Sequence, residues 1–145
     1  MLKVMGTEIA TGVVQAVAAR LRAAGLRPTR QRLALGELLF AGTDRHVSAE
    51  QLHAEAIVGG YGVSLATVYN TLHQFTQAGL LRELAVDAAK TYFDTNTSNH
   101  NHFFIEAEGR LEDIPSDCIK VAGVPQPPDG FEIAHVDVVV RLARR

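Results

Sequence analysis

The spacing of apolar residues changes once along this chain, and that change limits what the chain can fold into. Up to Gly79 they recur every three or four positions, which is the period of a helix that packs on one face. Beyond Gly79 they fall into short runs separated by turn residues, which is typical of strands. The 145 residues therefore predict an α+β chain, with helices first and strands afterwards.

Start and stop signals support four helices. Gly25 is expected to end the first helix, and Pro28 lies near the start of the second. Ser48 and Gln51 have the spacing of a capping box, and Ser64 is the expected N-cap of the last helix. The expected helices are 8–24, 31–40, 48–57 and 64–75.

Two short strands, 80–86 and 90–94, are predicted directly after the helices. Helices followed by such a β-ribbon are typical of a winged helix-turn-helix, so residues 1–94 are expected to form a DNA-binding domain. The polar, unpatterned stretch 95–99 is the expected hinge. Residues 95–145 are then expected to form a small β-rich dimerisation domain.

The second domain is predicted to contain three strands, 103–105, 111–114 and 131–142. The valines of 136–140 are nearly continuous, which indicates a last strand that is buried on both faces. Three strands in a domain this short cannot bury such a surface alone. Pairing with a second copy of the chain is therefore expected, and a homodimer is predicted.

Charge is distributed unevenly although the net charge is only −2. Between Arg20 and Arg45 the chain carries six arginines against two acidic residues, a local charge of +4, which suits nucleic acid. The single cysteine, Cys118, excludes an internal disulfide and any thiolate zinc cluster. With no apolar run of membrane length and no signal-peptide pattern, we expect a cytoplasmic protein without a membrane segment.

His100 and His102 are separated by one residue, so on a strand their imidazoles share one face and can bind one ion. His46 is expected in a polar turn, and together with Asp94 and Asp113 it can complete a set of nitrogen and oxygen ligands. Such ligands suit iron, manganese or zinc. The alternative is a pair of solvated histidines on an edge strand.

The fourth helix carries polar side chains opposite its leucines, as a helix in the major groove requires. An arginine-rich turn upstream can supply phosphate contacts. The alternative is an ordinary polar helix surface. The expected DNA-binding residues are Arg27, Thr29, Arg30, Arg32, Thr67, Tyr69 and Asn70, and Thr71 and Gln74 lie on or near the same face.

Five motifs follow in a fixed order: G-L-R-P-T-R-Q-R (25–32), H-V-S-A-E-Q-L (46–52), S-L-A-T-V-Y-N-T-L (64–72), A-G-L after Gln77, and H-N-H (100–102). In combination they resemble the ferric uptake regulator family over nearly the whole chain. The D-I-P-S step at 113–116, the missing cysteine pairs and the terminal 136–142 most closely resemble its iron response regulator branch.

This resemblance implies a dimeric repressor or activator that binds an AT-rich palindromic operator on double-stranded DNA and responds to iron status. Its sensory ion would be Fe²⁺ or Mn²⁺, with Zn²⁺ and heme as further candidates. The family's sensory ligands map onto His46, Asp94, His100 and His102, and Asp113 stands where the peroxide-sensing branch places a carboxylate.

Other family features do not carry over. Asn99 and Asn101 replace usual ligands of the family's second metal cluster. Ile105 and Glu108 replace the first cysteine pair of its structural zinc site. Cys118 is not followed by the proline of its heme-binding motif.

The predicted function is regulation of iron and heme genes by a protein that is not an enzyme and has no catalytic residues. Three alternatives to this function remain. One is a peroxide-sensing regulator with iron at the same ligands. Another, from a different class, is a metal-dependent hydrolase, which needs an open coordination position. The third is a DNA-binding scaffold that does not use metal. DNA binding with and without a chelator separates these classes.

Overall fold

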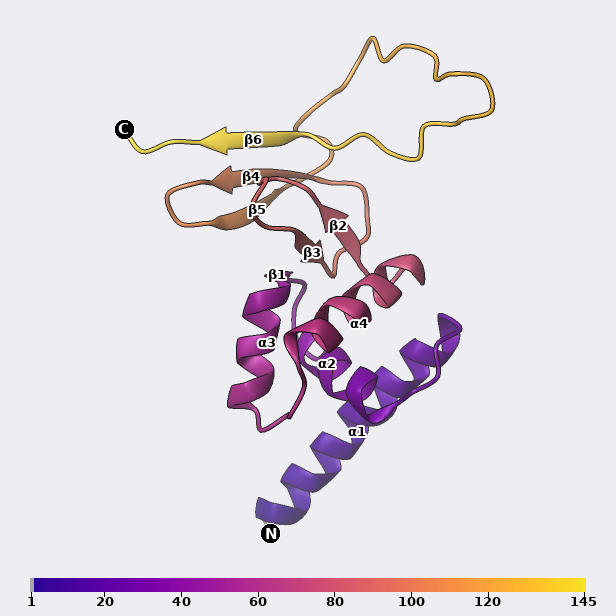
Figure 1. Cartoon of the computed structure of the whole chain (residues 1–145), viewed down its shortest axis with the longest axis vertical. Coiled ribbons are helices and arrows are strands. Elements are labelled where there is room, and N and C mark those ends of the chain that lie inside the picture. Colours follow the sequence, from indigo (N-terminus) through magenta and orange to yellow (C-terminus); the bar gives the residue numbers. More distant parts are fainter. Residues whose placement is uncertain (1) are drawn as a thin grey trace. The chain divides into compact units, whose positions relative to one another are not determined.

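The computed structural model describes residues 2–145, with side chains from residue 12 onward (Figure 1). The chain divides into two compact units, the residues through Thr97 and Ser98–Arg145. The described residues form four helices and two three-stranded sheets, which confirms the predicted α+β class. Among these residues, no helix combines the length and the apolar character needed to cross a bilayer.

A glycine ends the first helix, as predicted. The first helix, α1 (Leu2–Ala23), stops at Gly25, which has a φ of 80° that costs other residues conformational energy. The N–H of Leu26 then bonds to the carbonyl of Leu21, five residues back, and so satisfies a carbonyl at the helix end. The structure starts this helix at Leu2 rather than at residue 8.

The other three helices begin at hydroxyl caps. These are α2 (Arg30–Phe40), α3 (Ala49–Val58) and α4 (Leu65–Gln77). Each cap oxygen accepts a hydrogen bond from a backbone N–H three residues on, which satisfies a donor that the helix leaves open. The caps are Thr29, bonded by Arg32 at 3.3 Å, Ser48, bonded by Gln51 at 3.2 Å, and Ser64, bonded by Thr67 at 3.1 Å.

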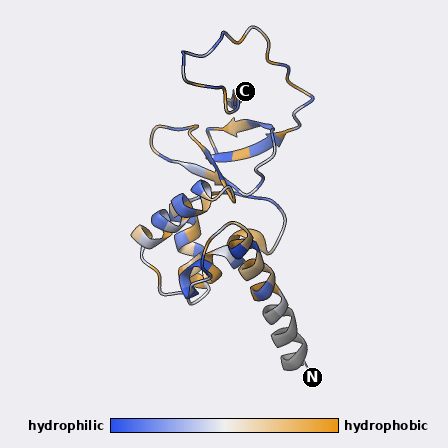
Figure 2. Ribbon diagram, turned by 90° about the vertical axis from the view of Figure 1, so that its right-hand side faces the viewer, coloured by the Kyte–Doolittle hydropathy of each residue, from blue (hydrophilic) through white to orange (hydrophobic). Residues whose placement is uncertain are grey.

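The helices enclose a core that is mostly aliphatic but also contains Phe75 and Phe93. Figure 2 shows hydrophobic and hydrophilic segments alternating along the helical ribbons, so the helices are amphipathic. Helix α1 packs against α2, and α3 against α4. The fully buried side chains include Leu21, Leu35, Leu39, Leu52, Leu72, Phe75 and Phe93.

The first unit also contains a small antiparallel sheet. Its strands are β1 (His46–Ser48), β2 (Arg82–Leu84) and β3 (Tyr92–Asp94), in the order β1-β3-β2. The two predicted strands are therefore present but shorter than expected. The placement of His46 in a turn was wrong, because residues 46–48 pair with β3 and add a third strand. Nothing in three consecutive residues signals a partner more than forty positions away.

The second unit contains β4 (Asn101–Ile105), β5 (Arg110–Ile114) and β6 (Val139–Leu142), in the order β5-β4-β6. The first two form a hairpin, and β6 runs parallel to β4. The predicted last strand, 131–142, is reduced to its final four residues. It was expected to be buried on both faces, but within this unit β6 is an edge strand with β4 as its neighbour. Phe131 is 75% exposed and Val136 is 44% exposed.

Helix packing gives a stability test at Gly36. A Cβ there would lie 2.6 Å from Cγ1 of Val17, a buried β-branched side chain that cannot swing aside. We expect Gly36→Ala to lower the free energy of unfolding by about 1–3 kcal/mol. The matched control is Gly12→Ala in α1, where a Cβ meets nothing within 4 Å. That change should stabilise by roughly 0.5–1 kcal/mol. Urea denaturation at one protein concentration measures both, and equal stabilisation by the two would contradict this packing.

Candidate functional site

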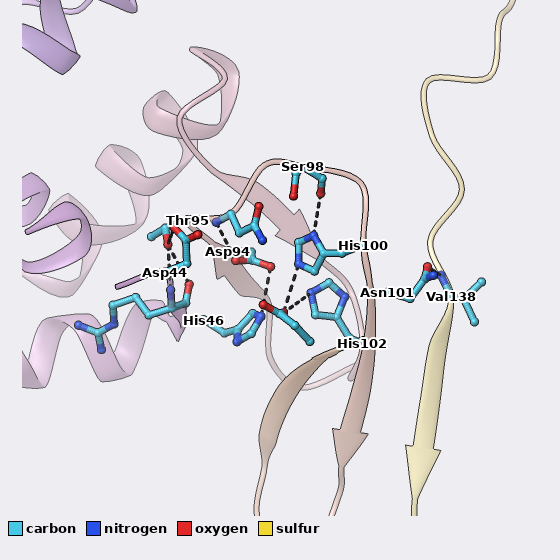
Figure 3. A network of polar contacts seen from close by, with 12 residues as sticks. Asp44, His46, Asp94, Thr95, Ser98, His100, Asn101, His102 and Val138 are labelled. Carbon is cyan, nitrogen blue, oxygen red and sulfur yellow. Dashed lines mark hydrogen bonds and ion pairs between the residues drawn. The ribbon is translucent and has the colours of Figure 1, made fainter. Parts of the chain in front are cut away.

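His46 and Asp94 lie opposite each other in the first sheet. They are register partners in the pairing of β1 with β3. His46 Nε2 lies 3.2 Å from Asp94 Oδ2, and Asp94 is fully buried (Figure 3). Directly opposed residues of an antiparallel pair have adjacent side chains, so strand register alone brings these two groups together.

The Asp94 carboxylate is oriented by the chain that follows it. Its Oδ1 accepts a hydrogen bond of 2.9 Å from the backbone N–H of Asn96. This contact turns Oδ2 toward His46. A carboxylate held through one oxygen presents the other in a defined direction, as the oriented ligands of metal sites do.

Thr95 fastens the end of β3 to the residue before β1. Its N–H donates to the carbonyl of Arg45 at 3.0 Å, and its Oγ1 accepts from the Arg45 N–H at 2.9 Å. The same hydroxyl donates to Asp44 Oδ1 at 3.2 Å (Figure 3). These contacts flank His46 and Asp94 and hold their register.

Arg45 also anchors this strand to the helices. Its guanidinium donates two hydrogen bonds of 2.7 Å to the carboxylate of Glu55 in α3. It donates a third, of 3.2 Å, to the carbonyl of Leu38 in α2. Bidentate pairs of this kind fix geometry as well as charge. His46 therefore follows a residue that is tied to two helices.

The second unit brings His100, His102 and Asp113 together. His102 and Asp113 are register partners of β4 and β5, and His100 directly precedes β4. Asp113 Oδ1 lies 3.2 Å from His100 Nε2 and 3.4 Å from His102 Nε2. One ligand atom from each of the three residues lies within 4.8 Å of the others. The predicted common face of the two histidines is thus present.

A backbone carbonyl selects the tautomer of His100. Its Nδ1 lies 2.7 Å from the carbonyl oxygen of Ser98 (Figure 3). A carbonyl only accepts, so Nδ1 carries the hydrogen and the neutral ring has its lone pair on Nε2. That nitrogen faces Asp113. Two imidazole nitrogens and a carboxylate oxygen form a donor set that suits Fe²⁺, Mn²⁺ or Zn²⁺, so these residues fit a divalent ion.

The neighbouring polar residues have other roles. The side-chain oxygen of Asn101 accepts a 3.2 Å hydrogen bond from the N–H of Val138, which ties the approach to β6 onto β4 (Figure 3). His135 lies 3.5 Å from Asp137, and its side chain is 45% exposed. His53 Nε2 lies 3.1 Å from the carbonyl of Val63.

The predicted DNA-binding residues mostly gather around one polar hollow in the first unit. The hollow has a volume of about 340 Å³ and lies between the start of α2 and one face of α4. Arg30 lies elsewhere, beside Tyr61, and Tyr69 is also outside it. Gln31, which the sequence did not single out, joins this hollow because it follows Arg30 in the first turn of α2. The lining residues are Arg27, Thr29, Gln31, Arg32, Thr67, Asn70, Thr71 and Gln74.

Tyr69 contacts α3 through its hydroxyl, which donates a 2.6 Å hydrogen bond to Glu50. This hydrogen bond lowers the pKa of Glu50 and raises the pKa of Tyr69. Glu50 is therefore a carboxylate and Tyr69 a neutral phenol at neutral pH. Sequence reasoning missed Glu50, because nothing local relates it to a residue nineteen positions further on.

Comparison with known proteins gives concordant results. The sequence model of the ferric uptake regulator family matches residues 23–141. The peroxide-responsive repressor PerR of Staphylococcus aureus strain Mu50 is 30% identical over 118 residues, which make up 81% of this chain and 79% of that protein.

Solved structures share the fold. The ferric uptake regulator of Pseudomonas aeruginosa, determined with manganese, has a TM-score of 0.66 and 26% identity, covering 88% of this chain and 96% of that one. The ferric uptake regulator of Vibrio cholerae has a TM-score of 0.67 at 24% identity, covering 86% and 96% of the two chains. At that identity the second likeness concerns the fold alone.

His102, which belongs to the proposed ligand cluster, and His135, which lies outside it, give a direct test of the metal site. We expect His102→Ala to weaken Mn²⁺ binding by more than about 10-fold, because it removes a donor that faces Asp113. His135→Ala is the matched control, since His135 contacts Asp137 instead. Titration of Mn²⁺ into the full-length variants at constant pH measures both. Equal affinities for the two variants would place the metal elsewhere.

Proposed function

This chain belongs to the ferric uptake regulator family, and we propose that it is a metal-responsive, sequence-specific DNA-binding repressor or activator of iron and heme homeostasis genes. Members of the family are transcription regulators and not enzymes, and they bind DNA and form dimers. The metal-dependent hydrolase is therefore not supported. The observation that carries the proposal is the convergence of His100, His102 and Asp113 in a chain of this family.

We propose that one divalent cation takes ligands from both units. The first contributes His46 and Asp94, and the second contributes His100, His102 and Asp113. Each set is oriented by backbone contacts on strands, and together they offer three imidazoles and two carboxylates. This donor set suits Fe²⁺ or Mn²⁺ in the cell and can also take Zn²⁺. The relative from Pseudomonas aeruginosa was determined with manganese, which agrees with this choice.

Such an ion would act as a ligand that is coupled to DNA binding. Its two sets of donors precede and follow the predicted hinge 95–99 in the chain. Thr95 is held to Arg45, so coordination restricts the residues after Thr95. If the ion favours the conformation that fits DNA, it raises DNA affinity by the same coupling free energy with which DNA raises metal affinity. Heme is not proposed as a ligand of this chain, because Cys118 is followed by Ile119 and the chain lacks a cysteine–proline pair.

A second copy of the chain completes the regulator. The second unit leaves Phe131, Ile133 and Val136 exposed, at 75%, 49% and 44%, and apolar residues in this number favour pairing. A two-fold dimer presents two copies of α4, and its half-sites must then lie about one turn of DNA apart. An AT-rich palindromic operator fits this symmetry.

Helix α4 is the proposed reading element. Thr67 and Asn70 point into the polar hollow beside Arg27, Thr29 and Arg32, so base-reading and phosphate-binding chemistry lie together. The residues that we propose to contact DNA are Arg27, Thr29, Arg30, Arg32, Thr67, Tyr69 and Asn70.

A peroxide-sensing regulator is the second candidate function. It is favoured by the 30% identity to a protein named as a peroxide-responsive repressor and by the place of Asp113 beside both histidines. Peroxide treatment separates the two candidates. A sensor loaded with Fe²⁺ would release DNA, while the Mn²⁺ form would stay bound. An iron regulator would stay bound in both forms.

The central test is DNA binding as a function of metal. We expect the full-length dimer to bind a duplex, selected from a randomised pool, at least about 5-fold more tightly with Mn²⁺ than with chelator, the lower end of typical coupling. His102→Ala should lose this difference but keep binding in chelator. Fluorescence anisotropy measures each affinity. Equal affinity of the wild type for the duplex with Mn²⁺ and with chelator would contradict metal-responsive DNA binding. It would favour the DNA-binding scaffold that does not use metal.

Two substitutions test the DNA surface. We expect Asn70→Ala to weaken binding to the selected duplex by about 1–3 kcal/mol and to relax base preference, as a lost base contact does. Arg30→Ala should weaken binding to every duplex and reduce the salt slope by about one unit, as a lost phosphate contact does. Salt titrations on selected and scrambled duplexes measure both. Wild-type behaviour of Asn70→Ala would remove α4 as the reading helix.

A further inference from the structure

Arg32 links the start of α2 to the exposed face of α4. Its Nε and Nη2 donate hydrogen bonds of 3.3 and 3.1 Å to Oε1 of Gln74. Its Nη1 donates to the backbone carbonyl of Arg27 at 3.0 Å. The guanidinium is thus held at both ends, by the turn before α2 and by a side chain forty-two residues away.

These contacts determine which way the Gln74 amide points. A guanidinium has five N–H donors and no acceptor, so only the amide oxygen of Gln74 can face it. The two donors match the two lone pairs of that oxygen. The NH₂ group must then point away from Arg32. Gln74 therefore presents hydrogen-bond donors and no free acceptor.

Gln74 lines the same hollow as the proposed base readers. Thr67, Asn70, Thr71 and Gln74 follow one another at helical spacing and line it together. Gln74 is exposed, so its NH₂ group is accessible to a ligand in the hollow. Two amides of α4 thus line the hollow, that of Asn70, which no other helix restrains among the described contacts, and that of Gln74, whose orientation is set by α2.

We propose that Gln74 is a donor-only base reader and that Arg32 is its positioning residue. This inference rests on the proposed DNA binding. In the major groove both purines offer N7, guanine adds O6, and thymine offers O4, whereas cytosine offers only its amino donor. Gln74 therefore accepts adenine, guanine or thymine at one base of each half-site and rejects cytosine. A free glutamine reads adenine with donor and acceptor together, and Arg32 removes that option.

The proposal also separates Arg32 from the other arginines of the turn. Three of its five donors are engaged within the protein, by Gln74 and by Arg27. Arg32 thus sets specificity through Gln74 and keeps two donors with which it can contact DNA, whereas Arg27 and Arg30 serve phosphates alone. A lysine at this position would keep the charge but would have no fork that holds the amide oxygen.

The experiment compares base preferences rather than affinities. The Mn²⁺-loaded full-length wild type, Gln74→Glu and Gln74→Ala each select duplexes from a randomised pool. A carboxylate only accepts, so Gln74→Glu should change the preference at one base by roughly 10-fold or more, from excluding cytosine to favouring it. Gln74→Ala should tolerate all four bases there. The matched control, Gln77→Glu, adds the same charge on the same helix and should change no base preference.

The Arg32 part of the proposal has its own variant. Arg32→Lys should let the amide rotate and shift the preference toward adenine at the same base, while Arg30→Lys should not. An unchanged base profile in Gln74→Glu and Gln74→Ala would overturn the reader. A changed profile in those two with a wild-type profile in Arg32→Lys would overturn the positioning role. Failure of the wild type to select any sequence would instead overturn DNA recognition, and this inference with it.

Discussion

The antiparallel pairing of β1 with β3 is the contact on which the rest of the first unit depends. Three residue pairs join the strands, and one of them sets His46 against the buried Asp94. So short a pairing is weak by itself. It persists because Thr95 bonds to both the N–H and the carbonyl of Arg45, and because Arg45 holds Glu55 at 2.7 Å. The strand that carries His46, a proposed ligand, is thereby tied to α2 and α3, the helices that pack against α4.

In the second unit, too, strand register brings the proposed ligands together. Register across β4 and β5 places His102 opposite Asp113, and the residue before the strand adds His100. Each ligand set thus comes from strand geometry, and the chain between the two sets is the short stretch 95–99. In the proposed mechanism an ion that joins the sets needs no large rearrangement within either unit, because their donors are oriented by Asn96 and Ser98 before it binds. The proposed conformational change on metal binding then takes place in the hinge between the two sets.

The proposed reading helix, α4, has two side chains that are oriented by other helices. Tyr69 is held by Glu50 of α3, and Gln74 by Arg32 of α2. Two side chains of α4 therefore have their polar ends set by other helices, while Asn70 has no such restraint among the described contacts. Base preference in this protein would then depend on residues that need not touch DNA, and a survey confined to α4 would miss them.

The sequence by itself determined the features that depend on neighbours in the chain. The glycine stops, the caps at Ser48 and Ser64, the apolar spacing of the helices and the shared face of His100 and His102 are all local, so composition and spacing sufficed. Only the tertiary structure decided the pairing of β1, the short extent of β6 and the orientation of the Gln74 amide. Each depends on a contact between segments more than thirty residues apart. The free energy of such a contact cannot be inferred from the sequence of either segment alone. The proposed ligand residues could therefore be listed from sequence, whereas the contacts that orient them could not.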